Sequence, residues 1–254
     1  MPKFIIGVFA AVIFTAVGAG PVSAQIPLDP TGQLAGFIPP SQGMMACARF
    51  VNKRVWVYPL NCALMCTIKG AATMTKNLSF DFTACEETGP FACKAGYDAA
   101  LGRLDQGLCQ SCLDQPAQQA LYPEYRDVVS SAKALTYCDA SNSVPFPDGI
   151  GSVSLNKDIN KCQDKTMRAV IKATKCLNLK CHPKTAEALF WGKPVNNAAC
   201  EDQDAVHSCK ARFQASSQKI VGCPPCLDAT ARMAIFDTVQ QALDTQNGDI
   251  YCAQ

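Results

Sequence analysis

The sequence predicts an all-α, disulfide-rich protein made of two tandem homologous domains with eight cysteines each. Three observations support this prediction. The chain of 254 residues contains 16 cysteines, the cysteine spacing of the first part recurs in the second, and apolar residues recur at intervals of three or four, which is the period of an α-helix.

The cysteines form two sets in which each member of the first set has a counterpart 114 to 116 residues later. Two copies of one unit are expected to fold separately, with most bridges inside each copy. The spacing leaves the pairing within a unit open, because many connectivities are possible. The first set is Cys47, Cys62, Cys66, Cys85, Cys93, Cys109, Cys112 and Cys138, and the second is Cys162, Cys176, Cys181, Cys200, Cys209, Cys223, Cys226 and Cys252.

Residues 1–24 have the pattern of a cleaved signal peptide, with one cation at Lys3, an apolar run from Phe4 to about Val17, and a small residue at the expected cleavage site. This run is shorter than the roughly 20 residues that a membrane span needs. We therefore predict secretion, to the extracellular space or to a periplasm, and no transmembrane segment. A formal net charge of +2 identifies no class of partner by itself.

The rest of the chain divides at changes of composition. We expect an N-terminal arm at 25–43, cysteine-rich helical repeats at 44–139 and 158–254, and a linker at 140–157. The linker prediction follows from the Ser, Pro and Gly content of DASNSVPFPDGIGSVSLNKD.

The helices of the first repeat are predicted from three stretches. The segment 49–60, RFVNKRVWVYPL, is rich in β-branched and aromatic residues, but its counterpart in the second repeat has a helical pattern, so a helix is predicted here as well. An apolar stripe follows at 97–108, and another at 128–135 belongs to a helix that Asp114 is expected to cap.

The second repeat has the clearer helical pattern. Its first helix is expected at 159–180, where the five-residue spacing between Cys176 and Cys181 and the proline at 183 both predict that the helix ends. Two further helices are expected, one at 206–220 and one from Pro225 that stops near Asn247-Gly248.

Each repeat contains one C-x-x-C motif, CQSC at 109–112 and CPPC at 223–226. We interpret both as structural, because cysteines three apart on a helix can bond to neighbouring helices. The alternative is a thiol-disulfide oxidoreductase that uses Cys223 and Cys226, which precede a helix. No histidine follows either motif, as covalent haem requires, and we predict no cofactor and no metal site.

The most distinctive surface feature is a row of basic residues on the first helix of the second repeat. Their spacing of three and four residues places them on one helical face. Such a face could bind an anionic extracellular polymer, surface or protein. The possible anion-binding face consists of Lys157, Lys161, Lys165, Arg168, Lys172 and Lys175.

No catalytic residue is predicted from the remaining polar groups. His182 is expected to cap a helix end, and His207 to face solvent or pack beside Cys209. Glu86 and Glu201 belong to acidic clusters expected near helix N-termini. The function predicted from sequence is therefore non-catalytic extracellular binding or a structural role. A carrier of a small ligand or lipid between the helices is the second alternative.

Overall fold

The computed structural model describes residues 27–28 and 34–252, so the predicted signal peptide lies outside the described residues. The predominantly helical, disulfide-rich prediction is confirmed. No helix among the described residues is long and apolar enough to cross a membrane. The helices are α1 (Gln42–Phe50), α2 (Val57–Met74), α3 (Cys93–Leu101), α4 (Gln115–Thr136), α5 (Lys157–Cys176), α6 (His182–Phe190), α7 (Cys209–Ser217) and α8 (Ala229–Ile250).

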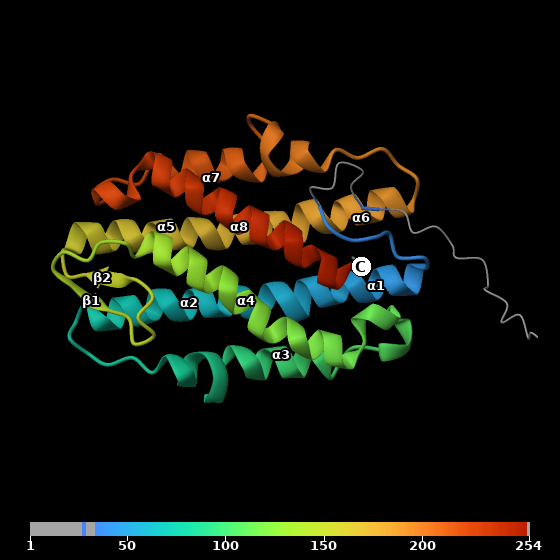
Figure 1. Cartoon of the computed structure of the whole chain (residues 1–254), viewed down its shortest axis with the longest axis horizontal. Helices are drawn as coiled ribbons and strands as arrows, with labels where there is room; N and C mark the ends of the chain where they lie inside the picture. Colours follow the sequence, from blue (N-terminus) through green and yellow to red (C-terminus); the bar gives the residue numbers. More distant parts are fainter. Residues whose placement is uncertain (1–26, 29–33, 253–254) are drawn as a thin grey trace, which may run out of the picture.

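We call residues 42–138 the first half and residues 157–252 the second half. In Figure 1 the α1–α2 row and the α5–α6 row lie side by side at the centre, with α3 beyond one and α7 beyond the other, while α4 and α8 cross them obliquely. Helix α2 contacts α5, and α4 contacts α8. The buried side chains of both halves form one continuous core that includes Trp56, Tyr125 and Phe236.

Each half begins with a long helix that is widened by a π turn, η1 (Val51–Trp56) in the first half and η5 (Leu177–Cys181) in the second. The prediction that the second of these helices ends before Cys181 is wrong. The N–H of His182 donates to the carbonyl of Leu177, five residues back, and the helix continues through Pro183. This wider turn displaces the carbonyl that a proline ring would otherwise meet, and it returns Cys181 to the face of Cys176.

Helices α4 and α8 have 22 residues each and begin with an aspartate cap. The side chain of Asp114 accepts the N–H of Ala117 at 2.9 Å, as predicted, and Asp228 accepts the N–H of Ala231 at 2.8 Å. Further π turns lie at Ala84–Thr88 (η2) and Ala199–Gln203 (η6), and 3-10 turns at Gln106–Leu108 (η3), Ser111–Leu113 (η4) and Pro225–Leu227 (η7).

All sixteen cysteines form disulfides, and six of the eight bridges lie within a half, as expected for most of them. The other two join the halves. They run from one end of α4 to the opposite end of α8, because a helix of 22 residues is about 33 Å long and holds its own flanking cysteines apart. The bridges within the halves are Cys47–Cys109, Cys62–Cys93, Cys66–Cys85, Cys162–Cys223, Cys176–Cys209 and Cys181–Cys200, and those between them are Cys112–Cys252 and Cys138–Cys226.

The predicted linker contains an antiparallel hairpin, β1 (Ser143–Pro145) with β2 (Ser152–Ser154). The hairpin packs against the end of α4, where the N–H of Ser152 donates to the carbonyl of Tyr137 at 2.7 Å. The described part of the arm makes the same contact with the end of α8, since the N–H of Phe37 donates to the carbonyl of Tyr251 at 2.6 Å. Both segments therefore hold the end of a long helix.

Glycine is needed where each segment passes this helix end. Gly36 has φ of 120° and Gly151 has φ of 79°. A Cβ atom at Gly36 would lie 2.5 Å from the Cβ of Tyr251, and one at Gly151 would lie 3.0 Å from the carbonyl oxygen of Tyr137. A larger residue at either position would push the segment away from the helix.

Candidate functional site

The C-x-x-C motifs hold no dithiol pair, because each cysteine bonds to a distant cysteine rather than to its neighbour in the motif. Cys109 bonds to Cys47, and Cys223 bonds to Cys162. Sulfur atoms also gather in two triplets whose members lie within 4.8 Å of one another, at Cys62, Cys66 and Cys93 and at Cys176, Cys181 and Cys209. Every one of these sulfurs is in a disulfide, so the triplets are stacked bridges without a free thiolate.

The six residues of the predicted anion-binding face are all exposed on α5. Arg168 is paired with Asp164, with 3.0 Å between Nε and Oδ2. Within the described part of the chain, the other five make no ion pair. The face therefore keeps most of its positive charge.

A groove of about 340 Å³ lies beside this face, between α5 and α7. Its floor is apolar and includes Ala173, Phe213 and the Cys176–Cys209 bridge. No carboxylate lines it, and four cations do: Lys172, Lys175, Lys180 and Arg212. Arg212 comes from α7, so periodicity along the α5 sequence could not reveal it.

The other end of the face borders a second groove of about 580 Å³ between α2 and α5. Lys157, Lys161 and Arg168 line it together with Asp164. Five of the six residues of the predicted face are thus divided between two grooves, and Lys165 lines neither. Only the one beside α7 combines several cations with an apolar floor and no acid.

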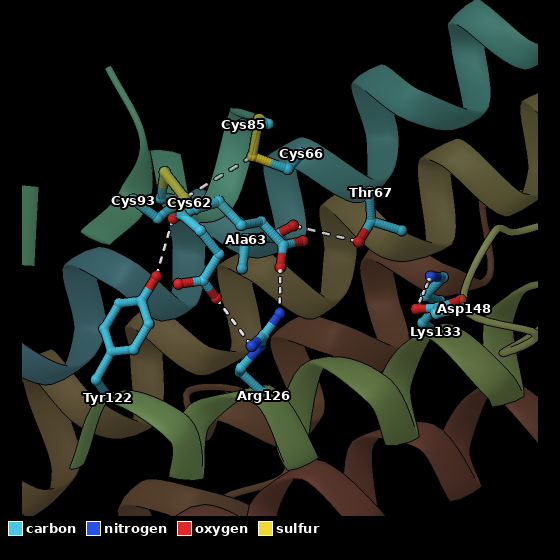
Figure 2. Close-up of polar contacts among 12 residues, drawn as sticks. Cys62, Ala63, Cys66, Thr67, Cys85, Cys93, Tyr122, Arg126, Lys133 and Asp148 are labelled. Atoms are coloured by element: carbon cyan, nitrogen blue, oxygen red, sulfur yellow. Dashed lines mark hydrogen bonds and ion pairs between the residues drawn. A yellow bond between two sulfur atoms is a disulfide. The ribbon is translucent and has the colours of Figure 1, made fainter. Parts of the chain in front are cut away.

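A polar cavity of about 230 Å³ in the first half was not predicted from sequence. Its charged walls are Glu86 from η2, Arg126 and Lys133 from α4, and Asp148 from the loop between β1 and β2. Figure 2 shows Arg126 and Lys133 rising from the same helix toward this region, and Thr67 facing it from α2. An adjoining pocket of about 290 Å³ shares Glu86, Arg126 and Asp148.

Both cations of this cavity are already neutralised by carboxylates. Lys133 is buried, with Nζ 2.6 Å from Oδ2 of Asp148 and 4.0 Å from the centroid of the Phe146 ring. Arg126 pairs with Glu87, with 2.8 Å between Nη1 and Oε1. The burial of Lys133 follows from the position of the hairpin, whose loop supplies Asp148 and Phe146.

Of the charged side chains in the cavity, Glu86 has the longest ion pair. Its side chain is 15% exposed, and its nearest cation, Nη2 of Arg126, lies 3.5 Å away. Burial raises the pKa of the Glu86 carboxyl, although the charges of Arg126 and Lys133 oppose the shift. The Glu86 backbone is held in place, since its carbonyl accepts the Tyr122 hydroxyl at 2.9 Å.

The corresponding place in the second half is filled by a buried ionic triad. The Nε2 of His182 lies 3.0 Å from Oε1 of Glu201 and 3.0 Å from Oδ1 of Asp244. All three residues are buried. The predictions that His182 caps a helix end, and that Glu201 only opposes a helix dipole, are therefore wrong, because both side chains point into the core.

Two amides hold the glutamate of the triad. Oε1 of Glu201 accepts Asn197 at 2.7 Å, and Oε2 accepts Gln240 at 2.9 Å. One ligand atom from each of His182, Glu201 and Asp244 lies within 4.8 Å of the other two, which is close enough to bind a metal ion. Although burial favours the neutral ring, hydrogen bonds to Asp244 and Glu201 raise the pKa of His182 to about 9. The imidazolium is thus the cation that neutralises these carboxylates.

We expect the stability of the protein to fall as the pH rises through about 9. The folded pKa of His182 lies above its ordinary value of 6.5, so its contribution is complete below pH 6.5 and disappears as the pH passes about 9. The expected loss is on the order of 3 kcal/mol. Urea unfolding at pH 6, 7.5 and 9.5 measures it, and His182→Gln should flatten the profile. An unchanged profile in that variant would contradict the assignment.

The other histidine behaves as predicted. The side chain of His207 is 75% exposed and lies 3.4 Å from Oδ1 of Asp204. Hydrogen bonds from the N–H groups of His207 and Val206 lower the pKa of the Asp204 carboxyl. His207 and Asp204 both line a pocket of about 300 Å³ together with Lys180, Lys184 and Arg212.

Comparison with family models, curated proteins and solved structures gave no match for this chain.

Proposed function

We propose that the protein is a secreted, non-catalytic binding protein that holds an anionic amphiphile in the groove between α5 and α7. The observation that carries this proposal is the combination of an apolar floor with four cations and no acid at one groove. An anionic headgroup meets the cations at the rim, while an apolar chain covers Phe213 and the Cys176–Cys209 bridge. Each buried methylene contributes about 0.8 kcal/mol.

The eight bridges support the secretory part of the proposal, because disulfides persist in oxidising compartments. The bonding of each C-x-x-C cysteine to a distant partner favours binding over the oxidoreductase alternative, which needs two neighbouring thiols.

We also propose that the halves are two copies of one unit. Helices α3 and α7 have nine residues each, and α4 and α8 have 22 each. The three bridges inside each half join its cysteines in the same order, first to sixth, second to fifth and third to fourth. The two copies differ in surface charge, since the basic row occurs only on α5.

Charge reversal at Lys172 and Lys175 should weaken the binding of dodecyl phosphate at least tenfold. Both side chains line the groove, so reversal replaces attraction of the headgroup by repulsion. The loss should shrink as salt is added, because exposed charges are screened. Calorimetric titration at two salt concentrations measures both effects.

The matched control reverses Lys157 and Lys161, two exposed lysines of the same helix outside this groove. Its net charge change is the same, and we expect dodecyl phosphate affinity to change less than twofold. Equal losses in both variants, together with binding of heparin, would instead assign the whole basic row to an anionic polymer. Undiminished dodecyl phosphate binding in the Lys172 and Lys175 variant would refute the proposal.

A further inference from the structure

The polar cavity of the first half and the ionic triad of the second half occupy equivalent places in the fold. Thr67 and His182 each directly follow the third cysteine of their half, and Glu86 and Glu201 each directly follow the fourth. Ser130 lies 16 residues into α4, and Asp244 lies 16 residues into α8. The glutamate is therefore present in both halves, while the imidazole and the aspartate are replaced by a small hydroxyl side chain in the first.

This replacement leaves space beside a carboxylate. Thr67, Ser130 and Glu86 all line the cavity of about 230 Å³. In the second half the equivalent glutamate receives His182 at 3.0 Å, Asn197 at 2.7 Å and Gln240 at 2.9 Å. In the first half Glu86 has only Arg126, at 3.5 Å. The partly exposed Glu86 carboxylate therefore has fewer donors than the buried carboxylate of Glu201.

The charges around the cavity favour a cation. Lys133 is paired with Asp148, and Arg126 is shared by two glutamates, at 2.8 Å from Glu87 and 3.5 Å from Glu86, so Glu86 has the longer contact. The four charged residues of the lining carry no net formal charge, and Glu87, which bonds to Arg126 outside the lining, brings the cluster to −1. An anionic or neutral ligand would leave that charge uncompensated, whereas a cationic ligand beside the 15% exposed Glu86 side chain neutralises it.

We propose that this cavity binds a small primary amine, whose ammonium group donates to the Glu86 carboxylate from the position that the His182 ring occupies in the other half. An ammonium group has three donors. The carboxylate of Glu86 accepts one, and the hydroxyl oxygens of Thr67 and Ser130 lie on the same wall to accept others. The cavity volume suits a molecule of a few heavy atoms. This site is separate from the amphiphile groove, and neither proposal depends on the other.

The test is calorimetric titration of the whole protein with n-butylamine at pH 7, with n-butanol as the uncharged probe of the same shape. Butylamine should bind and butanol should bind at least tenfold more weakly. Glu86→Gln should reduce butylamine affinity at least tenfold, because the amide keeps the shape and removes the charge. Asp127→Asn is the matched control, since Asp127 is an exposed acid of α4 outside the cavity lining, and it should leave affinity within twofold.

A second variant fills the cavity with the side-chain types that occupy the equivalent place in the second half. Thr67→His combined with Ser130→Asp should abolish butylamine binding and should raise the thermal midpoint, since the triad would then be complete in both halves. Equal binding of butylamine and butanol, undiminished butylamine binding in Glu86→Gln, or no butylamine binding at millimolar concentrations overturns the proposal. The Glu86→Gln result decides the matter if the double variant does not fold.

Discussion

Replacement of His182 by alanine is expected to lower the free energy of unfolding by about 3–5 kcal/mol. The variant leaves Glu201 and Asp244 facing each other in the core without the imidazolium that neutralises them. Burial already raises the pKa of the Asp244 carboxyl, while the hydrogen bond and the charge of His182 oppose that shift. Without His182, Asp244 should take up a proton at higher pH. Denaturant unfolding at pH 5 and pH 8 measures both consequences.

Two control substitutions remove no buried cation. Thr67→Ala changes the equivalent position in the first half and should cost no more than about 1 kcal/mol. His207→Ala removes the exposed histidine and should be within about 0.5 kcal/mol of the parent. A His182→Ala cost no larger than these values would show that the triad does not stabilise the fold.

Removal of both bridges between the halves is expected to lower the unfolding free energy by at least 4 kcal/mol while leaving one cooperative transition. The variant carries serine at Cys112, Cys138, Cys226 and Cys252. The bridges close loops of 140 and 88 residues, and a loop near 100 residues is worth about 4.7 kcal/mol in the chain-entropy model. A single transition is expected because the buried core is continuous across both halves.

The matched control removes Cys66–Cys85 and Cys181–Cys200, one short bridge from each half with a separation of 19 residues. It deletes the same number of bridges but leaves the halves joined, and its expected cost is smaller because its loops are shorter. Calorimetry distinguishes the outcomes. Two separate transitions in the variant without bridges between the halves would show that the predicted repeats fold independently.

The cysteine spacing and the apolar periodicity were sufficient to predict a helical protein, because both depend on local sequence. They could not reveal that η5 widens the helix. The five-residue spacing of Cys176 and Cys181 indicated a break under α-helical geometry, although a π turn places such residues on one face. Comparison of the two halves indicated an extra residue in this helix, since the equivalent cysteines Cys62 and Cys66 are only four apart.

The buried polar groups were harder to predict because their partners come from distant segments. His182 meets Asp244 across 62 residues, and Lys133 is covered by a hairpin that composition alone presents as a linker. One local signal was available. Alignment of the halves places Glu86 opposite Glu201 but Thr67 opposite His182, which marks a carboxylate retained without the histidine.

The crossing of the two bridges also orders the events of folding during synthesis. Cys112 emerges 140 residues before Cys252, and Cys138 emerges 88 residues before Cys226. At about 5–20 residues per second, these thiols wait several seconds or more for their partners. A bond between Cys112 and Cys138 would trap the chain. Once α4 has formed, its length keeps these two unpaired thiols apart. The helix therefore prevents a bond between Cys112 and Cys138 before their correct partners are synthesised.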